Sequence, residues 1–201
     1  MEVYFVRHGE TYYNKEERLL GISDSPLNEY GKELAQITAE ALKNIDFDIA
    51  YCSPMTRTRQ TAEPFMKGRD IPFIIDQRLK EISFGVEEGG SIPEAKSNAS
   101  HPVHKFFAKP SQYIPPKDAE SFESLYERSR DFIKNELVHL ESKYKKILIL
   151  THGAFIRSLI NTYLNYELDD FWKTSVKNCA VTILDIENGK CSLKEISKIY
   201  Y

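Results

Sequence analysis

Two short runs of uninterrupted apolar residues occur in the chain, at positions 3–6 and 147–150. Continuous apolar runs of this length are typical of strands that are buried on both faces of a sheet. Each run gives way abruptly to polar residues that include a histidine followed by a glycine. In open parallel sheets, ligands bind outside the carboxyl ends of the strands. The two runs therefore predict two core strands that deliver chemistry to one edge of a sheet.

Weaker patterns predict the other strands. Their ranges are 48–52, 71–75, 180–186 and 191–199. Pro72 indicates that its strand begins there or lies at a sheet edge, because proline cannot donate to a ladder of backbone hydrogen bonds. Asn188-Gly189 separates the last two ranges and is typical of the turn of a β-hairpin.

Apolar residues at helical spacing predict the helices. They are expected at residues 28–44, from position 54 onward, at 121–144 and at 154–163. Asn28 is a suitable N-cap for the first helix, and Ser53 followed by a proline is a favoured start for the second. Strands that alternate with helices predict an α/β domain with a mostly parallel sheet, to which the hairpin adds one antiparallel edge strand.

Two stretches fit neither pattern. Residues 10–27 are polar, with Gly21 and Pro26, and they predict a loop whose length is typical of functional loops. Residues 85–120 contain three glycines and five prolines without a clean period. We expect this segment to be a partly helical insertion that lies over the carboxyl edge of the sheet as a lid, within a single domain that spans residues 1–201.

Composition and charge exclude several classes of function. The chain has 201 residues and a formal net charge of -3, which gives no basic footprint for nucleic acid. No apolar run approaches membrane-spanning length, and the N-terminus leads into a strand instead of a signal peptide, so we expect a cytoplasmic protein. Cys52, Cys179 and Cys191 show no C-x-x-C spacing and are expected to be reduced. The sequence does not predict the oligomeric state.

Arginines and histidines follow the predicted core strands. Arg7 and His8 follow the first, and His152 follows the second. Arg57 lies in the first turns of a predicted helix. Because arginine matches phosphate oxygens bidentately, and helix N-termini favour anions, the set predicts a phosphoryl site. One histidine would attack phosphorus, the other, if protonated, would stabilise charge, and Glu81 is the candidate acid for the departing alkoxide.

These residues resemble the histidine phosphatase superfamily, in its branch of cofactor-dependent phosphoglycerate mutases and small phosphatases of the alpha-ribazole or broad-specificity type. The resemblance covers nearly the whole chain. The segments that carry it are Arg7-His8-Gly9-Glu10-Thr11 with Asn14, Asp24-Ser25-Pro26-Leu27 with Gly31, residues 53–62, Glu81 with Phe84-Gly85, Thr151-His152-Gly153 and Asn178-Cys179-Ala180-Val181.

The resemblance implies a three-layer sandwich and a reaction that needs neither a metal nor a cofactor. It implies that His8 is the phosphorylated nucleophile and that Glu81 is the proton donor. The partner would be a small phosphomonoester. The positions implied to bind phosphate or substrate are Arg7, Asn14, Gly21, Arg57, His152 and Gly153.

Two departures from the family pattern bear on substrate choice. Glu87 stands where the family often has tryptophan, and Ala119 replaces the glycine of its common Gly-Glu-Ser. Both positions flank the insertion, so they affect specificity and leave the phosphoryl chemistry unchanged. Glu10, Glu87 and Glu88 are alternatives to Glu81 as the acid.

The insertion contains two further groups of side chains that could suggest a site. His101 and His104 have the H-x-x-H spacing of a zinc pair, but no third ligand in good register accompanies them, and a metal is not expected. Phe106, Phe107 and Tyr113 are expected to form a small core of the insertion itself.

The phosphatase and mutase reactions share a phosphohistidine and differ in the acceptor, which is water or a retained hydroxyl group. A mutase keeps its intermediate from water, which favours a closing lid and additional anion-binding residues. The mutases of the family carry an arginine-rich insertion, whereas residues 85–120 contain lysines and no arginine. We therefore expect hydrolysis. Mutase-type phosphoryl transfer and a non-catalytic phospho-ligand binding module are the alternatives.

Overall fold

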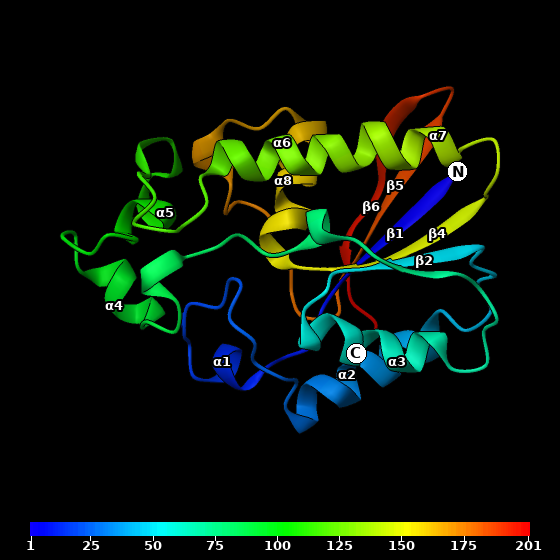
Figure 1. Cartoon of the computed structure of the whole chain (residues 1–201), viewed down its shortest axis with the longest axis horizontal. Helices are drawn as coiled ribbons and strands as arrows, with labels where there is room; N and C mark the ends of the chain where they lie inside the picture. Colours follow the sequence, from blue (N-terminus) through cyan, green and yellow to red (C-terminus); the bar gives the residue numbers. More distant parts are fainter.

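A six-stranded sheet lies at the centre of the structure, a computed structural model that describes residues 1–201 (Figure 1). The strand order is β3-β2-β4-β1-β5-β6. The strands are β1 (Glu2–Arg7), β2 (Ile49–Cys52), β3 (Phe73–Ile75), β4 (Lys146–Thr151), β5 (Val181–Glu187) and β6 (Lys190–Lys198).

The strand directions confirm the predicted fold class. β1 to β4 are mutually parallel, and β5 runs against β1. β6 pairs with β5 as the second half of the hairpin and forms one edge of the sheet. β5, the one strand that runs opposite to all the others, therefore lies next to the edge strand and not at the edge itself. β3 forms the other edge, as Pro72 indicated.

Helices cover both faces of the sheet, which gives three layers. Figure 1 shows α2 and α3 on one side and α6 and α8 on the other. The helices are α1 (Tyr12–Lys15), α2 (Glu29–Ala41), α3 (Thr56–Met66), α4 (Ile92–Ser97), α5 (His104–Ala108), α6 (Phe122–Phe132), α7 (Val138–Leu140) and α8 (Gly153–Leu164). Asn28 caps α2 as predicted, since its side-chain oxygen accepts the N–H of Gly31 at 2.8 Å.

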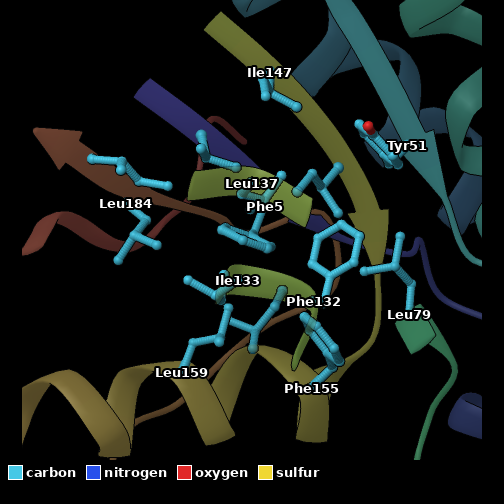
Figure 2. Close-up of a cluster of buried hydrophobic side chains, with 14 of the residues drawn as sticks. Phe5, Tyr51, Leu79, Phe132, Ile133, Leu137, Ile147, Phe155, Leu159 and Leu184 are labelled. Atoms are coloured by element: carbon cyan, nitrogen blue, oxygen red, sulfur yellow. The ribbon is translucent and has the colours of Figure 1, made fainter. Parts of the chain in front are cut away.

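Separate apolar clusters fill the two spaces between the layers. Under α6 and α8, Phe5 and Ile147 of the sheet meet Phe132, Phe155 and other buried side chains (Figure 2). The opposite face packs alternate residues of the same strands against α2 and α3. The core strands are therefore buried on both faces, which is why their sequences are continuously apolar.

The predicted helix over 121–144 is one helical rod with an irregular middle. Ser121 caps α6, a π-helical segment spans Ile133–Leu137, and α7 follows directly. Ile133 and Leu137 are buried in the core under the sheet, so the wider turn still presents an apolar face. A π-helical turn is a local insertion into a helix and does not end it.

The loop after β1 and the start of α3 differ from their predictions. α1 lies inside the expected loop, where Thr11 and Asn14 form a capping box. α3 begins at Thr56 without a side-chain cap of its own, so the hydroxyl of Ser53 does not cap it. Asp24 caps the helix instead. Its carboxylate accepts the backbone N–H of Thr56 at 3.2 Å and the hydroxyl of Thr56 at 2.5 Å.

The segment 85–120 is partly helical, with α4, α5 and two 3₁₀ turns, Gly85–Glu87 and Pro110–Gln112. Phe106 is only 1% exposed and contacts the rings of Phe107 and Tyr113. It also stacks on Phe122 of α6, in a cluster that includes residues outside the insertion, so the expectation of a core of the insertion alone is wrong. Phe106 and Phe107 also line the cavity next to the strand ends. Trp172 extends this cluster, and its indole N–H donates to the carbonyl of Phe106 at 2.7 Å. None of the helices has the length and apolar character needed to cross a membrane.

Candidate active site

The register of the two central strands brings the two histidines to one edge of the sheet. Arg7 at the end of β1 pairs with Thr151 at the end of β4, and the N–H of His8 donates to the carbonyl of Thr151 at 3.0 Å. His8 and His152 therefore follow adjacent strand ends. The centroids of their rings are 5.2 Å apart.

His8 is held as a neutral side chain with one nitrogen free. Its Nδ1 lies 2.8 Å from the carbonyl oxygen of Gly9, a contact in which Nδ1–H donates. Burial, followed by the charges of Arg57 and Arg7, holds the pKa of His8 well below its usual value. His8 is consequently neutral at pH 7, with the proton on Nδ1. The lone pair on Nε2 remains available for attack on an electrophile.

His152 is also neutral, and both of its nitrogens are bonded. Arg57 donates from Nε to Nδ1 at 3.2 Å, so Nε2 carries the proton and donates to the hydroxyl of Ser53 at 2.7 Å. Burial is the main cause that lowers the pKa of His152, and the charge of Arg57 adds to it. The charge-stabilising role that the sequence suggests for the second histidine requires it to be protonated, and the neutral His152 seen here does not meet that condition. The contact of Ser53 with His152 was not predicted from the sequence.

Two arginines supply positive charge beside the histidines. Arg57 is fully buried, and Nη1 and Nη2 donate to the carbonyls of Ser23 and Gly21 at 2.8 and 2.5 Å. Burial lowers the pKa of Arg57 to about 10, so it stays cationic at neutral pH. Arg7 donates from Nη1 to the carbonyl of Val176 at 2.7 Å, while its Nε is buried without a partner. An unsatisfied buried guanidinium nitrogen favours an anion beside it.

Glu81 is the only acid that lines the adjacent cavity, which has a volume of about 650 Å³. Its carboxylate accepts the backbone N–H of Ala154, at the start of α8, at 3.1 and 3.3 Å. The three competing acids have other partners: Glu10 accepts from the Asn28 side chain, Glu87 lies 3.6 Å from His101, and Glu88 accepts only backbone amides.

The structure brings most of the predicted binding positions to this cavity. Arg7, Asn14 and Gly153 line it together with Glu81, whereas His8, Arg57 and His152 are buried more deeply. Gly21 does not line the cavity. Its N–H donates to Glu88 at 3.0 Å and its carbonyl accepts from Arg57, so its amide is not free for a phosphate oxygen.

Arg157 is a cavity residue that the sequence interpretation missed. It lies one helical turn after Gly153, and residues four apart share a helix face, so its spacing was the signal that could have identified it. Its Nε donates to the carbonyl of Thr174 at 3.2 Å, and its guanidinium lies 4.8 Å from the ring centre of Trp172. Arg157 forms no ion pair with an acidic residue.

The structure contains no group of three or more His, Cys, Asp or Glu side chains that could hold a metal ion. Within the H-x-x-H pair, His101 lies near Glu87, and Nδ1 of His104 lies 3.1 Å from the carbonyl of Ala95. The two histidines thus have separate contacts.

An α/β sandwich whose strand ends gather two neutral histidines and two arginines beside one acidic residue is suited to the chemistry of phosphate groups. The chain belongs to the histidine phosphatase superfamily, branch 1, whose family model matches residues 3–198.

Relatives of this chain include phosphatases and mutases. A probable phosphatase of Schizosaccharomyces pombe is 30% identical over 185 residues, which cover 90% of this chain and 82% of that protein. Phosphoserine phosphatase 1 of Hydrogenobacter thermophilus is 25% identical, with 94% and 89% covered. A probable phosphoglycerate mutase of Proteus mirabilis is 31% identical, with 94% and 86% covered. These relatives establish the family and leave the reaction, hydrolysis or mutase transfer, undecided.

Solved structures confirm the fold. YhfR of Bacillus stearothermophilus superimposes with a TM-score of 0.89 at 28% identity, covering 98% of this chain and 97% of the other. The alpha-ribazole phosphatase of Shigella flexneri superimposes with a TM-score of 0.86 at 25% identity, covering 98% and 96%. The similarity therefore includes the insertion as well as the sheet and its flanking helices.

Proposed function

We propose that this protein is a phosphatase that hydrolyses a small phosphomonoester through a phosphohistidine on His8. The observation that carries the proposal is the state of His8, a neutral ring with its Nδ1 proton bonded to Gly9 and its Nε2 unbonded, next to two arginines. A neutral imidazole nitrogen is a nucleophile, whereas an imidazolium is not. The nearby positive charges favour the anionic phosphoryl group that it would attack.

In the first step, the Nε2 lone pair of His8 forms a bond to phosphorus while the bond from phosphorus to the alcohol oxygen breaks. The departing oxygen takes a proton from Glu81. In the second step, water attacks phosphorus, Glu81 accepts a proton from that water, and the electron pair of the P–N bond returns to His8. The products are the free alcohol and inorganic phosphate.

Arg57→Ala is expected to lower kcat by about 100- to 1000-fold, as the loss of a donor to transition-state charge does in other enzymes. The same change removes the donor that fixes the His152 ring. Steady-state kinetics with p-nitrophenyl phosphate would measure the effect. A change confined to KM would contradict a role in the transition state.

The cationic side chains of the insertion support hydrolysis over mutase transfer. Its lysines are Lys96, Lys105, Lys109 and Lys117, and of these only Lys96 lines the cavity. Lys109 instead pairs with Asp169 at 3.1 Å. A mutase must retain a second phosphate group while the intermediate reorients, and the insertion contributes only Lys96, beside Arg18 and Arg157 from other segments.

The test is a rate survey of the purified protein with a panel of small phosphomonoesters, which includes 3-phosphoglycerate together with its bisphosphate. Release of inorganic phosphate would support the phosphatase and rank its substrates by kcat/KM. Isomerisation without release would contradict hydrolysis and support a mutase. Binding of phosphate without any turnover would support the binding module.

Arg157 leads us to expect a preference for substrates with a carboxylate near the phosphate. A Cβ atom at Gly153 would lie 3.1 Å from Nη1 of Arg157 and 3.3 Å from Nε of Arg7, so both donors face the same small space. Glycine at this position leaves that space open. Burial and the charge of Arg7 lower the pKa of Arg157 to about 10, which leaves it cationic at neutral pH.

Arg157→Met is expected to lower kcat/KM for O-phosphoserine by about 10- to 100-fold, since a hydrogen bond between charged groups is lost. O-phosphoethanolamine differs from it only by the missing carboxylate, and its kcat/KM should change by less than about threefold. Initial rates of phosphate release with both substrates measure the ratio. Equal losses for the two substrates would show that Arg157 does not recognise the carboxylate.

A further inference from the structure

Glu88 has no role in the proposed reaction, yet its carboxylate accepts four backbone N–H groups. Oε2 accepts those of Gly21 and Ser23 at 3.0 and 3.2 Å, and Oε1 accepts those of Ile22 and Phe84, each at 2.9 Å. Three of these donors are consecutive residues of the loop that follows α1. The insertion segment is therefore fastened to that loop by one side chain.

The same loop holds Arg57 from its other side. The N–H groups of Gly21 and Ser23 face Glu88, while their carbonyls accept Nη2 and Nη1 of Arg57. The peptide group between Gly21 and Ile22 thus lies between a carboxylate and a guanidinium, with its N–H towards Glu88 and its carbonyl towards Arg57, so each charge faces the end of the dipole that it prefers. Two carbonyls fix the plane of the guanidinium, and its Nε then meets Nδ1 of His152.

Gly21 lies at the tightest point of this arrangement. A Cβ atom there would overlap the carboxylate of Glu88 and the carbonyl oxygen of Ile82. The absence of a side chain is what allows the carboxylate to approach the loop backbone. This contact gives a structural reason for a glycine at position 21 that does not require it to touch the phosphate.

We propose that Glu88 is a positioning residue, which acts through the loop of residues 21–23 to fix the guanidinium of Arg57 against His152. The kinetic part of this inference rests on the proposed phosphatase function. Glu88 touches neither His8 nor the cavity itself. It can affect turnover through the loop that holds Arg57 or through the N–H of Phe84, which lines the cavity, and a double-mutant cycle with Arg57 distinguishes the two routes. A carboxylate suits the task because it offers acceptors only, whereas an amide would place its NH₂ group against two of the N–H donors.

Glu88→Gln should lower kcat for p-nitrophenyl phosphate by about tenfold or more while KM changes by less than about threefold, because Arg57 is proposed to act in the transition state. The matched control is Glu87→Gln, which removes the neighbouring carboxylate. Glu87 is bonded to neither the loop nor Arg57, and its variant should keep kcat within about twofold of the wild type. Equal kcat values for the two variants would overturn the inference.

A double-mutant cycle separates positioning from a general loss of structure. In an Arg57→Ala background, the addition of Glu88→Gln should lower kcat by less than about a further twofold, because residues that act as one unit are not additive. A further tenfold loss would show that Glu88 acts independently of Arg57. Thermal unfolding of each variant checks that it is folded. If Glu88→Gln does not fold, Glu88→Asp replaces it, because its carboxylate is withdrawn from the loop by one methylene, and the same loss of kcat is expected.

Orthovanadate, which takes the geometry of the phosphoryl transition state, tests the inference without turnover. By calorimetry, Glu88→Gln should weaken its binding by about tenfold and that of inorganic phosphate by less than about threefold. If the wild type shows no turnover, but Glu88→Gln still binds vanadate about tenfold more weakly than the wild type does, the phosphatase is refuted and the positioning role remains. Unchanged vanadate affinity in Glu88→Gln would refute the positioning role.

Discussion

His8→Ala is expected to lower kcat for every phosphomonoester by about 10⁴-fold or more, the scale of loss when a covalent nucleophile is removed. The neighbouring ring of His152 is not expected to take over, because both of its nitrogens are bonded, one to Arg57 and the other to Ser53. Phosphate release by the variant, measured against the rate without enzyme, gives the effect. Retained turnover would exclude His8 as the nucleophile.

The matched control for this experiment is His139→Ala. His139 lies in α7 and is exposed to solvent, and α7 lies at the end of the sheet where β1 begins, opposite His8, so its loss should leave kcat unchanged (Figure 1). Quenching of a reaction with ³²P-labelled substrate in alkaline detergent supplies a second readout. Label that is stable to base and labile to acid should appear in wild type and in His139→Ala, and should be absent from His8→Ala.

The sequence was sufficient to predict the strands and the residues that follow them. Residues 3–6 and 147–150 could be recognised as buried strands, and parallel strands bring their carboxyl ends to a common edge. The proximity of His8 and His152 therefore follows from two local patterns and one general rule. The structure adds the register, Arg7 opposite Thr151, that makes the two histidines direct neighbours.

The hydrogen-bond partners could not be predicted in the same way. Ser53 has the local signature of a helix cap, yet its hydroxyl bonds to His152, 99 residues away in the chain. Glu88 lies 67 residues from the amide of Gly21 that it accepts. Contacts at such separations depend on how the loops pack over the sheet edge. The hydrophobic pattern, which reports only which face of an element is buried, carries no information about them.

The charge state of the histidines shows why burial matters to this site. Three groups that can carry a positive charge, His8, His152 and Arg57, lie together almost without exposure. Burial and mutual repulsion remove the charge from both histidines, and the arginine keeps it because its pKa stays near 10. The fold thereby keeps the ring of His8, the proposed nucleophile, neutral beside a fixed cation.

Glu81→Gln should separate the two kinds of leaving group. Glutamine keeps the shape and an acceptor oxygen for the N–H of Ala154, but it cannot supply a proton. For alkyl phosphates, whose alkoxide is a strong base, kcat should fall by about 100- to 10,000-fold. Transfer of the phosphoryl group from p-nitrophenyl phosphate to His8 should be nearly unaffected, because p-nitrophenolate departs without a proton. Stopped-flow absorbance for the aryl ester and phosphate release for the alkyl esters measure the two rates.

The second half of the reaction makes the test more specific. Water must lose a proton as it attacks the phosphohistidine, and glutamine cannot accept one, so the intermediate should accumulate in Glu81→Gln. A burst of p-nitrophenolate equal to the enzyme concentration, followed by a slow steady state, is the expected result. A uniform loss of rate for aryl and alkyl esters, with no burst, would assign the proton transfer to another group. Since no other acid lines the cavity, the remaining candidates would be His152, water and the substrate itself.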